Sequence, residues 1–142
     1  MPPPTALSSV GRNVQFEVEE LYVDVSGTYS FLSTATSPAG WDIYTFLYVN
    51  AFNPVAPLTN VLIGDDGFPN IGLSGFSIAL LANTNYFFVN TGFGNSDAGA
   101  FTKRIEGPGT IHLNASVPEP ETLALLGLGF AGLVFTRRRA KA

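Results

Sequence analysis

Apolar and polar residues alternate along most of this chain with a period of two. The pattern runs from Val14 to about Thr110 and has no helical spacing within it. Its clearest stretches place apolar residues at Val14, Phe16 and Val18, and then at Leu21, Val23 and Val25. A period of two is that of a β-strand with one buried face. The sequence therefore predicts an all-β body.

Turn-forming residues divide this body into short segments. Glycine, proline and asparagine cluster between the apolar stretches, where they favour turns and loops. The predicted turns and loops lie at 27–28, 53–54, 57, 64–67, 82–84 and 107–109. The predicted strands are 14–25 in two stretches, 29–32, 41–49 as a central strand, 76–81, 85–91 and 101–106. We expect 76–81 and 85–91 to pair across their short Ala-Asn-Thr turn. Short strands at regular spacing predict a β-sandwich or a jelly-roll-like fold.

Composition and charge exclude several classes of function. The chain has no Cys and one His, which excludes a disulfide framework, a thiolate zinc site, a Cys nucleophile and a multi-histidine metal centre. Residues 1–121 carry three basic and eleven acidic side chains, a net charge of −8, and the remaining residues carry +4. An acidic body repels phosphate backbones, so we expect no binding of nucleic acid.

The C-terminal 26 residues form a three-part pattern. Val117-Pro118-Glu119-Pro120 comes first, an uncharged run of 13 residues from Leu123 to Phe135 follows, and Arg137, Arg138 and Arg139 close it. As a helix, the run would rise about 20 Å, less than the roughly 30 Å hydrocarbon core of a bilayer. The prolines restrict the residues before them to extended conformations, so we expect this short, transmembrane-like helix to begin at or after Glu121. Positive charge behind it would place the acidic body outside the cell.

This pattern resembles the PEP-CTERM sorting signal of Gram-negative bacteria. The resemblance implies that Pro118, Glu119 and Pro120 are recognised by an exosortase, a membrane-embedded cysteine transpeptidase. It also implies that the apolar run and the arginines hold the chain in the inner membrane until processing. Such proteins are associated with exopolysaccharide and biofilm production. They carry an N-terminal signal peptide, whereas the proline-rich start here has no basic or apolar region, and we expect the true start to lie upstream.

The body, from about Val14 to Ile111, is similar to bacterial pre-peptidase C-terminal-like domains. The similarity rests on Gly27-Thr28-Tyr29-Ser30-Phe31, Asp42-Ile43-Tyr44, Phe52-Asn53-Pro54, Asp65-Asp66 and Gly107-Pro108-Gly109. It implies a secreted β-sandwich that serves in folding, adhesion or contact with polysaccharide or protein, with no catalytic constellation. The predicted organisation is an extended or disordered segment (1–13), a sandwich domain (14–112), a linker with the Pro-Glu-Pro motif (113–122) and the apolar helix with its arginine-rich tail (123–142).

Candidate sites for chemistry in the body are weak. Any Ser-His-Asp arrangement must use His112, but no Gly-x-Ser-x-Gly nucleophile elbow occurs, and an exposed histidine at the end of a strand is the favoured interpretation. Asp65 and Asp66 are weak calcium candidates, since oxygen ligands in loops suit this ion. Their possible co-ligands are Asn60, Asp42 and Asp97. Turn chemistry explains the Asp pair better.

Two function hypotheses follow. The first is a non-enzymatic, exported protein of the envelope or extracellular matrix, sorted by an exosortase, associated with exopolysaccharide and without a cofactor. The alternative is an adhesin module that binds polysaccharide or calcium. Trp41 and Tyr48 are aromatic residues that could stack on sugars, although a Trp in an alternating strand belongs more often to the core.

Overall fold

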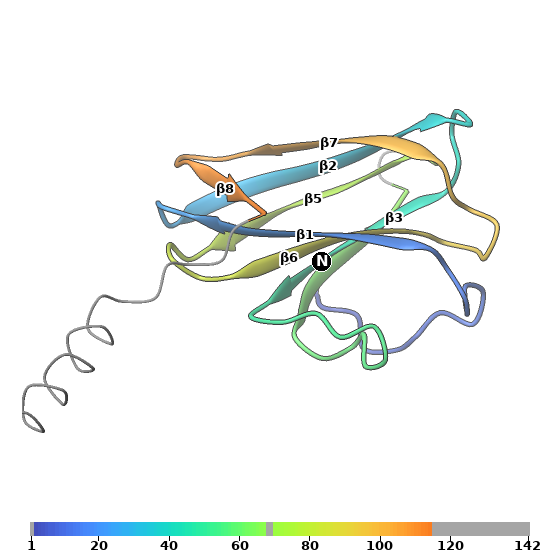
Figure 1. Ribbon diagram of the computed structural model, residues 1–142, viewed down its shortest axis with the longest axis horizontal. Helices are drawn as coiled ribbons and strands as arrows, with labels where there is room; N and C mark the ends of the chain where they lie inside the picture. Colours follow the sequence, from blue (N-terminus) through green and yellow to red (C-terminus); the bar gives the residue numbers. More distant parts are fainter. Residues whose placement is uncertain (1, 68–69, 115–142) are drawn as a thin grey trace, which may run out of the picture.

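The structure is a computed structural model, and it describes residues 2–67 and 70–114. Eight strands are described, and they are labelled in Figure 1. They are β1 (Phe16–Val23), β2 (Gly27–Ser37), β3 (Ile43–Val49), β4 (Val61–Asp66), β5 (Leu73–Leu80), β6 (Tyr86–Gly92), β7 (Ala100–Glu106) and β8 (Ile111–Leu113). The predicted C-terminal helix lies outside the described residues. Within them there is no helix with the length and apolar character needed to cross a bilayer.

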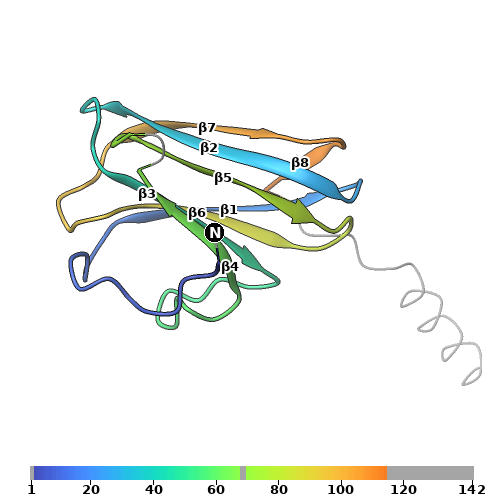
Figure 2. The same cartoon turned by 180° about the vertical axis from the view of Figure 1, so that it is seen from behind.

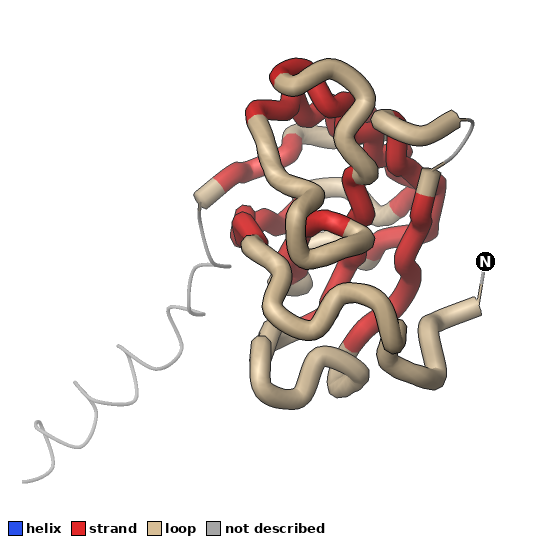
Figure 3. Tube along the Cα trace, turned by 90° about the vertical axis from the view of Figure 1, so that its right-hand side faces the viewer, coloured by secondary structure: helices blue, strands red, loops and turns tan. Residues whose placement is uncertain are grey.

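The strands form two antiparallel sheets that pack face to face. One sheet has five strands in the order β4-β3-β6-β1-β8, and the other has three in the order β5-β2-β7. The two layers are seen edge-on in Figure 1 and from the end of the molecule in Figure 3. The all-β, two-sheet architecture predicted from the alternating pattern is confirmed, and β3 lies inside its sheet, as expected for a central strand.

The predicted pairing of 76–81 with 85–91 is wrong. β5 belongs to the three-stranded sheet and β6 to the five-stranded one, so the turn between them crosses from one layer to the other. At this crossing Asn83 has a positive φ of 55°, and its N–H donates to the Val23 carbonyl 2.9 Å away. Among the connections between the described strands, only that from β3 to β4 stays within one sheet.

Two predicted turns also differ from the structure. Gly64, Asp65 and Asp66 complete strand β4 and do not form a loop, and the chain turns only after them, at Gly67 with a φ of +74°. Gly27 is the first residue of β2, and the chain turns before it, between Val23 and Gly27. In both places residues common in turns are paired in a ladder with a neighbouring strand.

The core lies between the sheets and follows the predicted alternation at Leu21 and Val23. In the first half of β1 the prediction is wrong, because Glu19 is buried and Phe16 is 50% exposed. Leu21 and Val23 of β1 and Tyr29 of β2 are fully buried, and Phe31 and Phe88 pack together with ring centroids 5.0 Å apart. The main cluster comprises Leu21, Val23, Tyr29, Phe31, Leu47, Ile63, Phe76, Leu80, Tyr86 and Phe88. A smaller cluster of Ala35, Trp41 and Ile43 lies apart from it. These two clusters fix the inner faces of the sheets, and a third cluster of Tyr48, Val61 and Val89 lies on the outer face of the five-stranded sheet.

Candidate functional site

The outer face of the five-stranded sheet carries a row of aromatic side chains. Antiparallel sheets commonly have one face on the core and polar residues on the other. In β3 the buried Ile43 and Leu47 face the core, so the residues that alternate with them point outward. These residues are Tyr44, Phe46 and Tyr48. Strand β3 is therefore apolar on both faces.

These rings belong to a continuous chain of six aromatic side chains. Its members are, in order, Phe93, Tyr44, Phe46, Tyr48, Phe52 and Phe16. The distances between successive ring centroids are 6.4, 4.3, 6.4, 4.8 and 5.5 Å. Such spacings are those of stacked and edge-to-face pairs. Tyr48 is buried, Phe16 is 50% exposed, and the other four are partly exposed, so the chain of rings remains accessible from outside.

Gly64 makes room for the central ring. It pairs with Phe46 across strands β4 and β3, and a Cβ added at Gly64 would lie 2.5 Å from Cδ1 of that ring. β4 is an edge strand, and an aromatic ring laid over a glycine of an edge strand compensates for the missing side chain. The position of Phe46 is thus fixed by its neighbour.

Two loops form walls beside the rings and create a groove of about 680 Å³. One wall is the N-terminal segment, residues 4–14, and the other is the β3–β4 loop, residues 52–58 (Figure 2). The first wall is held because the N–H groups of Arg12 and Asn13 both donate to Oδ1 of Asn95, at 2.8 and 2.9 Å. We call this site the aromatic groove. Its volume is within the usual range for ligand sites, about 300–1,000 Å³.

Acidic side chains gather near the Tyr44 end of the groove. Burial, and next the charge of Asp97, raises the pKa of Asp42, whose Oδ1 is buried without a hydrogen-bond partner. Burial is also the main cause that raises the pKa of Asp66, with Asp42, Asp65 and Asp97 adding to it. Burial and the charges of Asp66 and Asp65 raise the pKa of Tyr44, so its phenol stays protonated and able to donate a hydrogen bond. The surroundings of this end are therefore acidic, although these carboxylates are not among the residues that line the groove.

The two calcium candidates face opposite sides of their strand. Asp65 is 3% exposed, and its Oδ2 accepts a hydrogen bond from the Gly75 N–H at 2.9 Å, whereas Asp66 is exposed. Neighbouring residues of a strand point to opposite faces, so the pair does not converge on one point. Within residues 2–67 and 70–114, no three acidic or histidine side chains are arranged to hold a metal ion. Calcium binding stays a prediction.

The other candidate residues lie outside the groove or are buried. Trp41 is 9% exposed and its Nε1 donates to the Ala100 carbonyl, which confirms the core interpretation. Tyr48 lies in the groove wall at 3% exposure, with its hydroxyl donating to the Pro57 carbonyl. His112 belongs to strand β8 and stacks on Tyr22, with ring centroids 4.3 Å apart and 5° between the ring planes.

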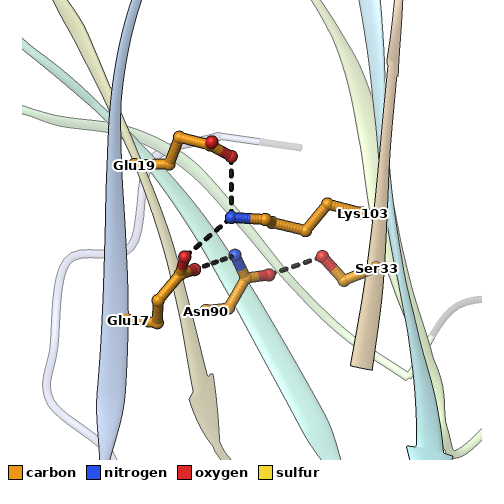
Figure 4. A network of polar contacts seen from close by, with 5 residues as sticks. All are labelled: Glu17, Glu19, Ser33, Asn90 and Lys103. Carbon is orange, nitrogen blue, oxygen red and sulfur yellow. Dashed lines mark hydrogen bonds and ion pairs between the residues drawn. The ribbon is translucent and has the colours of Figure 1, made fainter. Parts of the chain in front are cut away.

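A polar layer bridges the two sheets, buried at Ser33, Asn90 and Glu19 and open to solvent at Glu17 (Figure 4). Lys103 of β7 makes ion pairs with Glu17 and Glu19 of β1, each at 2.7 Å. Beside it, the Ser33 hydroxyl donates to Oδ1 of Asn90, and Nδ2 of Asn90 donates to Glu17 at 3.5 Å. Every labelled residue of this layer has a partner within it. Because its polar atoms satisfy one another, the layer joins the sheets and serves structure.

The sorting pattern lies beyond the described residues, and comparison with known proteins bears on it directly. A sandwich domain followed by this pattern defines a class of protein, an exported domain with a C-terminal sorting signal. Residues 116–139 match the model of the PEP-CTERM protein-sorting motif, and the match contains Pro118, Glu119, Pro120 and the three arginines. The motif implies an exported protein that an exosortase sorts and that is anchored at the membrane before processing. No curated protein and no solved structure matches the chain.

The aromatic groove is the feature that the sequence interpretation missed. The aromatic density of 41–49 predicts a central strand, with Trp41 and Tyr48 as the residues that could stack on sugars, but it does not by itself predict an outward row. A finer signal was present: both alternating sets of β3 are apolar, and one set is entirely aromatic. A strand in an antiparallel sandwich needs only one apolar face. The second face therefore indicates that something covers or binds it.

Proposed function

We propose that this chain is a non-enzymatic, exported protein that an exosortase processes at its tail and that then resides in the cell envelope or extracellular matrix, in association with exopolysaccharide. The observation that carries the proposal is the sorting motif at residues 116–139. The sandwich is its cargo, a body of the kind seen in pre-peptidase C-terminal-like domains. The sequence supports a non-enzymatic role because it has no Cys and only one His, which stacks on Tyr22.

The tail supplies the physical steps of sorting. The apolar run of 13 residues is short for a permanent span, and mismatch costs only fractions of a kcal/mol per Å, so it anchors the chain for a limited time. The arginines keep the C-terminal end on the cytoplasmic side. Pro118, Glu119 and Pro120 then lie at the outer interface, within reach of an embedded transpeptidase.

Replacement of Glu119 tests this proposal. The full chain is expressed behind a signal peptide in a host that has the matching exosortase, and membrane and medium are blotted. We expect Glu119→Ala to leave the precursor in the membrane and block processing, since the anchor is untouched while the recognised carboxylate is gone. Glu121→Ala is the matched control, with one acidic residue removed beside the motif. Equal release of the parent and Glu119→Ala would show that Pro-Glu-Pro is only a linker here.

A further inference from the structure

We propose that the aromatic groove binds an uncharged polysaccharide chain, whose sugar rings pack against the aromatic side chains of its floor. It rests on the proposed export only for the place where protein and polysaccharide meet, outside the cytoplasm. The test uses purified protein. Its failure would leave sorting by the tail untouched, and a failure of sorting would leave the groove untouched.

The fold covers these rings only in part. Outside the core between the sheets, Phe46 and Phe52 pack against a smaller buried cluster of Tyr48, Val61 and Val89. Part of the surface of Phe46, Phe52 and Phe93 nevertheless stays open. Around them, large apolar side chains of both walls are also exposed. These include Leu7 at 65%, Val55 at 89% and Leu58 at 39%. A contiguous exposed apolar surface of this kind marks a binding site more often than a structural one.

The shape of the surface indicates a flat ligand with repeated units. Successive outward residues of a strand are about 7 Å apart, and the ring chain extends this row beyond both ends of β3. Tyr44 and Phe46 stack on each other, so a ligand that lies along the row meets the parts of the rings that stay open to solvent rather than a series of free ring faces. The rings of a polysaccharide have apolar C–H faces that suit such contacts, and their edges carry hydroxyls. The groove offers those hydroxyls Ser8, Ser9, Thr91 and the phenol of Tyr44.

Charge selects among the polymers that could stack on such a row. Single-stranded nucleic acids also stack on aromatic residues, but they require a positively charged groove. Here Arg12 is the single charged residue among the described residues that line the groove, and the carboxylates of Asp42 and Asp66 lie near Tyr44 without lining it. One arginine beside these acidic neighbours does not make the positive groove that a polyanion needs, so an uncharged chain fits better. An uncharged polysaccharide is the partner that fits both the rings and the charge.

Affinity electrophoresis tests the inference. The full chain is purified in a polyoxyethylene detergent and run through native gels that contain hydroxyethyl cellulose, galactomannan, dextran or starch, with alginate and poly(dT) as polyanions. We expect at least one uncharged polymer to retard the protein and neither polyanion to do so. Retardation by alginate or poly(dT) alone, or by none of the polymers, would overturn the proposal.

Variants locate the binding. Tyr44→Ala removes one ring of the floor and should lower the affinity by roughly tenfold. Tyr22→Ala is the matched control. Tyr22 belongs to the same five-stranded sheet and stacks on His112, but it does not line the groove. Gly64→Ala keeps every ring and displaces Phe46, so it should also weaken binding. Melting curves confirm that each variant is folded. Retention of full affinity by folded Tyr44→Ala and Gly64→Ala would overturn the proposal.

Discussion

Asp65 and Asp66 are adjacent in sequence and differ in what their carboxyl groups do. Asp65 is buried and accepts the Gly75 N–H, a bond that joins β4 of one sheet to β5 of the other. Asp66 is exposed in a neighbourhood of like charge. If both were turn residues, replacing either would cost little stability. In strand β4, Asp65 links the two sheets through its hydrogen bond and Asp66 does not.

Alanine at these two positions should therefore give different results. Asp65→Ala removes a buried carboxylate and leaves the part-buried Gly75 N–H without this acceptor, so we expect a loss of about 1–3 kcal/mol in the free energy of unfolding. Asp66→Ala should cost less than about 0.5 kcal/mol, as surface substitutions do. Urea unfolding measures both. Equal losses would contradict the structural distinction, and a loss that appears only with Ca²⁺ present would instead support a metal at this site.

Asp42 gives the protein a pH dependence of predictable sign. Its carboxyl has a pKa raised above the usual 3.8, mainly by burial and then by Asp97, so the folded state holds this proton more tightly than the unfolded state. The stability that it contributes is therefore lost as pH rises from 3.8 through the raised pKa. We expect Asp42→Asn to melt increasingly above the parent between about pH 3 and pH 7. A melting difference that does not change with pH would contradict this.

At the scale of single elements, strand β7 shows the difference between exposed and enclosed ion pairs. Lys103 reaches across the sandwich to Glu17 and Glu19, and the Glu19 side chain is only 10% exposed. The next residue, Arg104, pairs with Glu106 on the same strand, with both side chains more than half exposed. The first pair joins two sheets, whereas the second lies in water within one strand.

Replacing Lys103 and Arg104 in turn should distinguish the enclosed ion pair from the exposed one. Lys103→Ala leaves the buried Glu19 carboxylate without its partner, and we expect a loss of about 2–4 kcal/mol in the free energy of unfolding. Arg104→Ala is the matched control on the same strand and should cost less than about 1 kcal/mol. Denaturant unfolding at neutral pH measures both. Similar small losses would mean that water reaches Glu19 and replaces the ammonium group.

The strands also show how much of the fold could be predicted from the sequence alone. Alternation identified the buried face of β1 at Leu21 and Val23, where apolar residues face the core. At Phe16 and Val18 it indicated the wrong face, because Glu17 and Glu19 point inward to their ion pairs with Lys103. It could not say which sheet a strand joins, since a turn of a few residues can pair two strands or carry the chain to the other layer. The turn at Asn83 does the latter. Likewise, the groove depends on the N-terminal segment and the β3–β4 loop meeting over β3, a long-range placement that no local pattern encodes.

At the scale of the whole molecule, the groove and the tail use different parts of the five-stranded sheet. The described chain ends at Asn114, just after β8 at one edge of the sheet, and β8 pairs with Leu21 to Val23 at the end of β1. The groove lies over β3 and β6 and touches β1 only at Phe16, its first residue. A chain held at the membrane through its C-terminal residues therefore emerges from the sheet away from the groove. Binding and anchoring are compatible in one protein.

The arginine cluster is expected to decide whether the chain stops in the membrane. Burying one arginine at mid-membrane costs roughly 2.5–3.5 kcal/mol, so Arg137, Arg138 and Arg139 together oppose passage strongly. In a host without exosortase, replacing all three by Ser should lower the fraction of protein held in the membrane and raise the fraction that is released. Replacing all three by Lys is the matched control, since it keeps the charge and should keep retention. Blots of membrane and soluble fractions measure both variants, and retention of the serine variant at the parent's level would show that the apolar run anchors the chain without them.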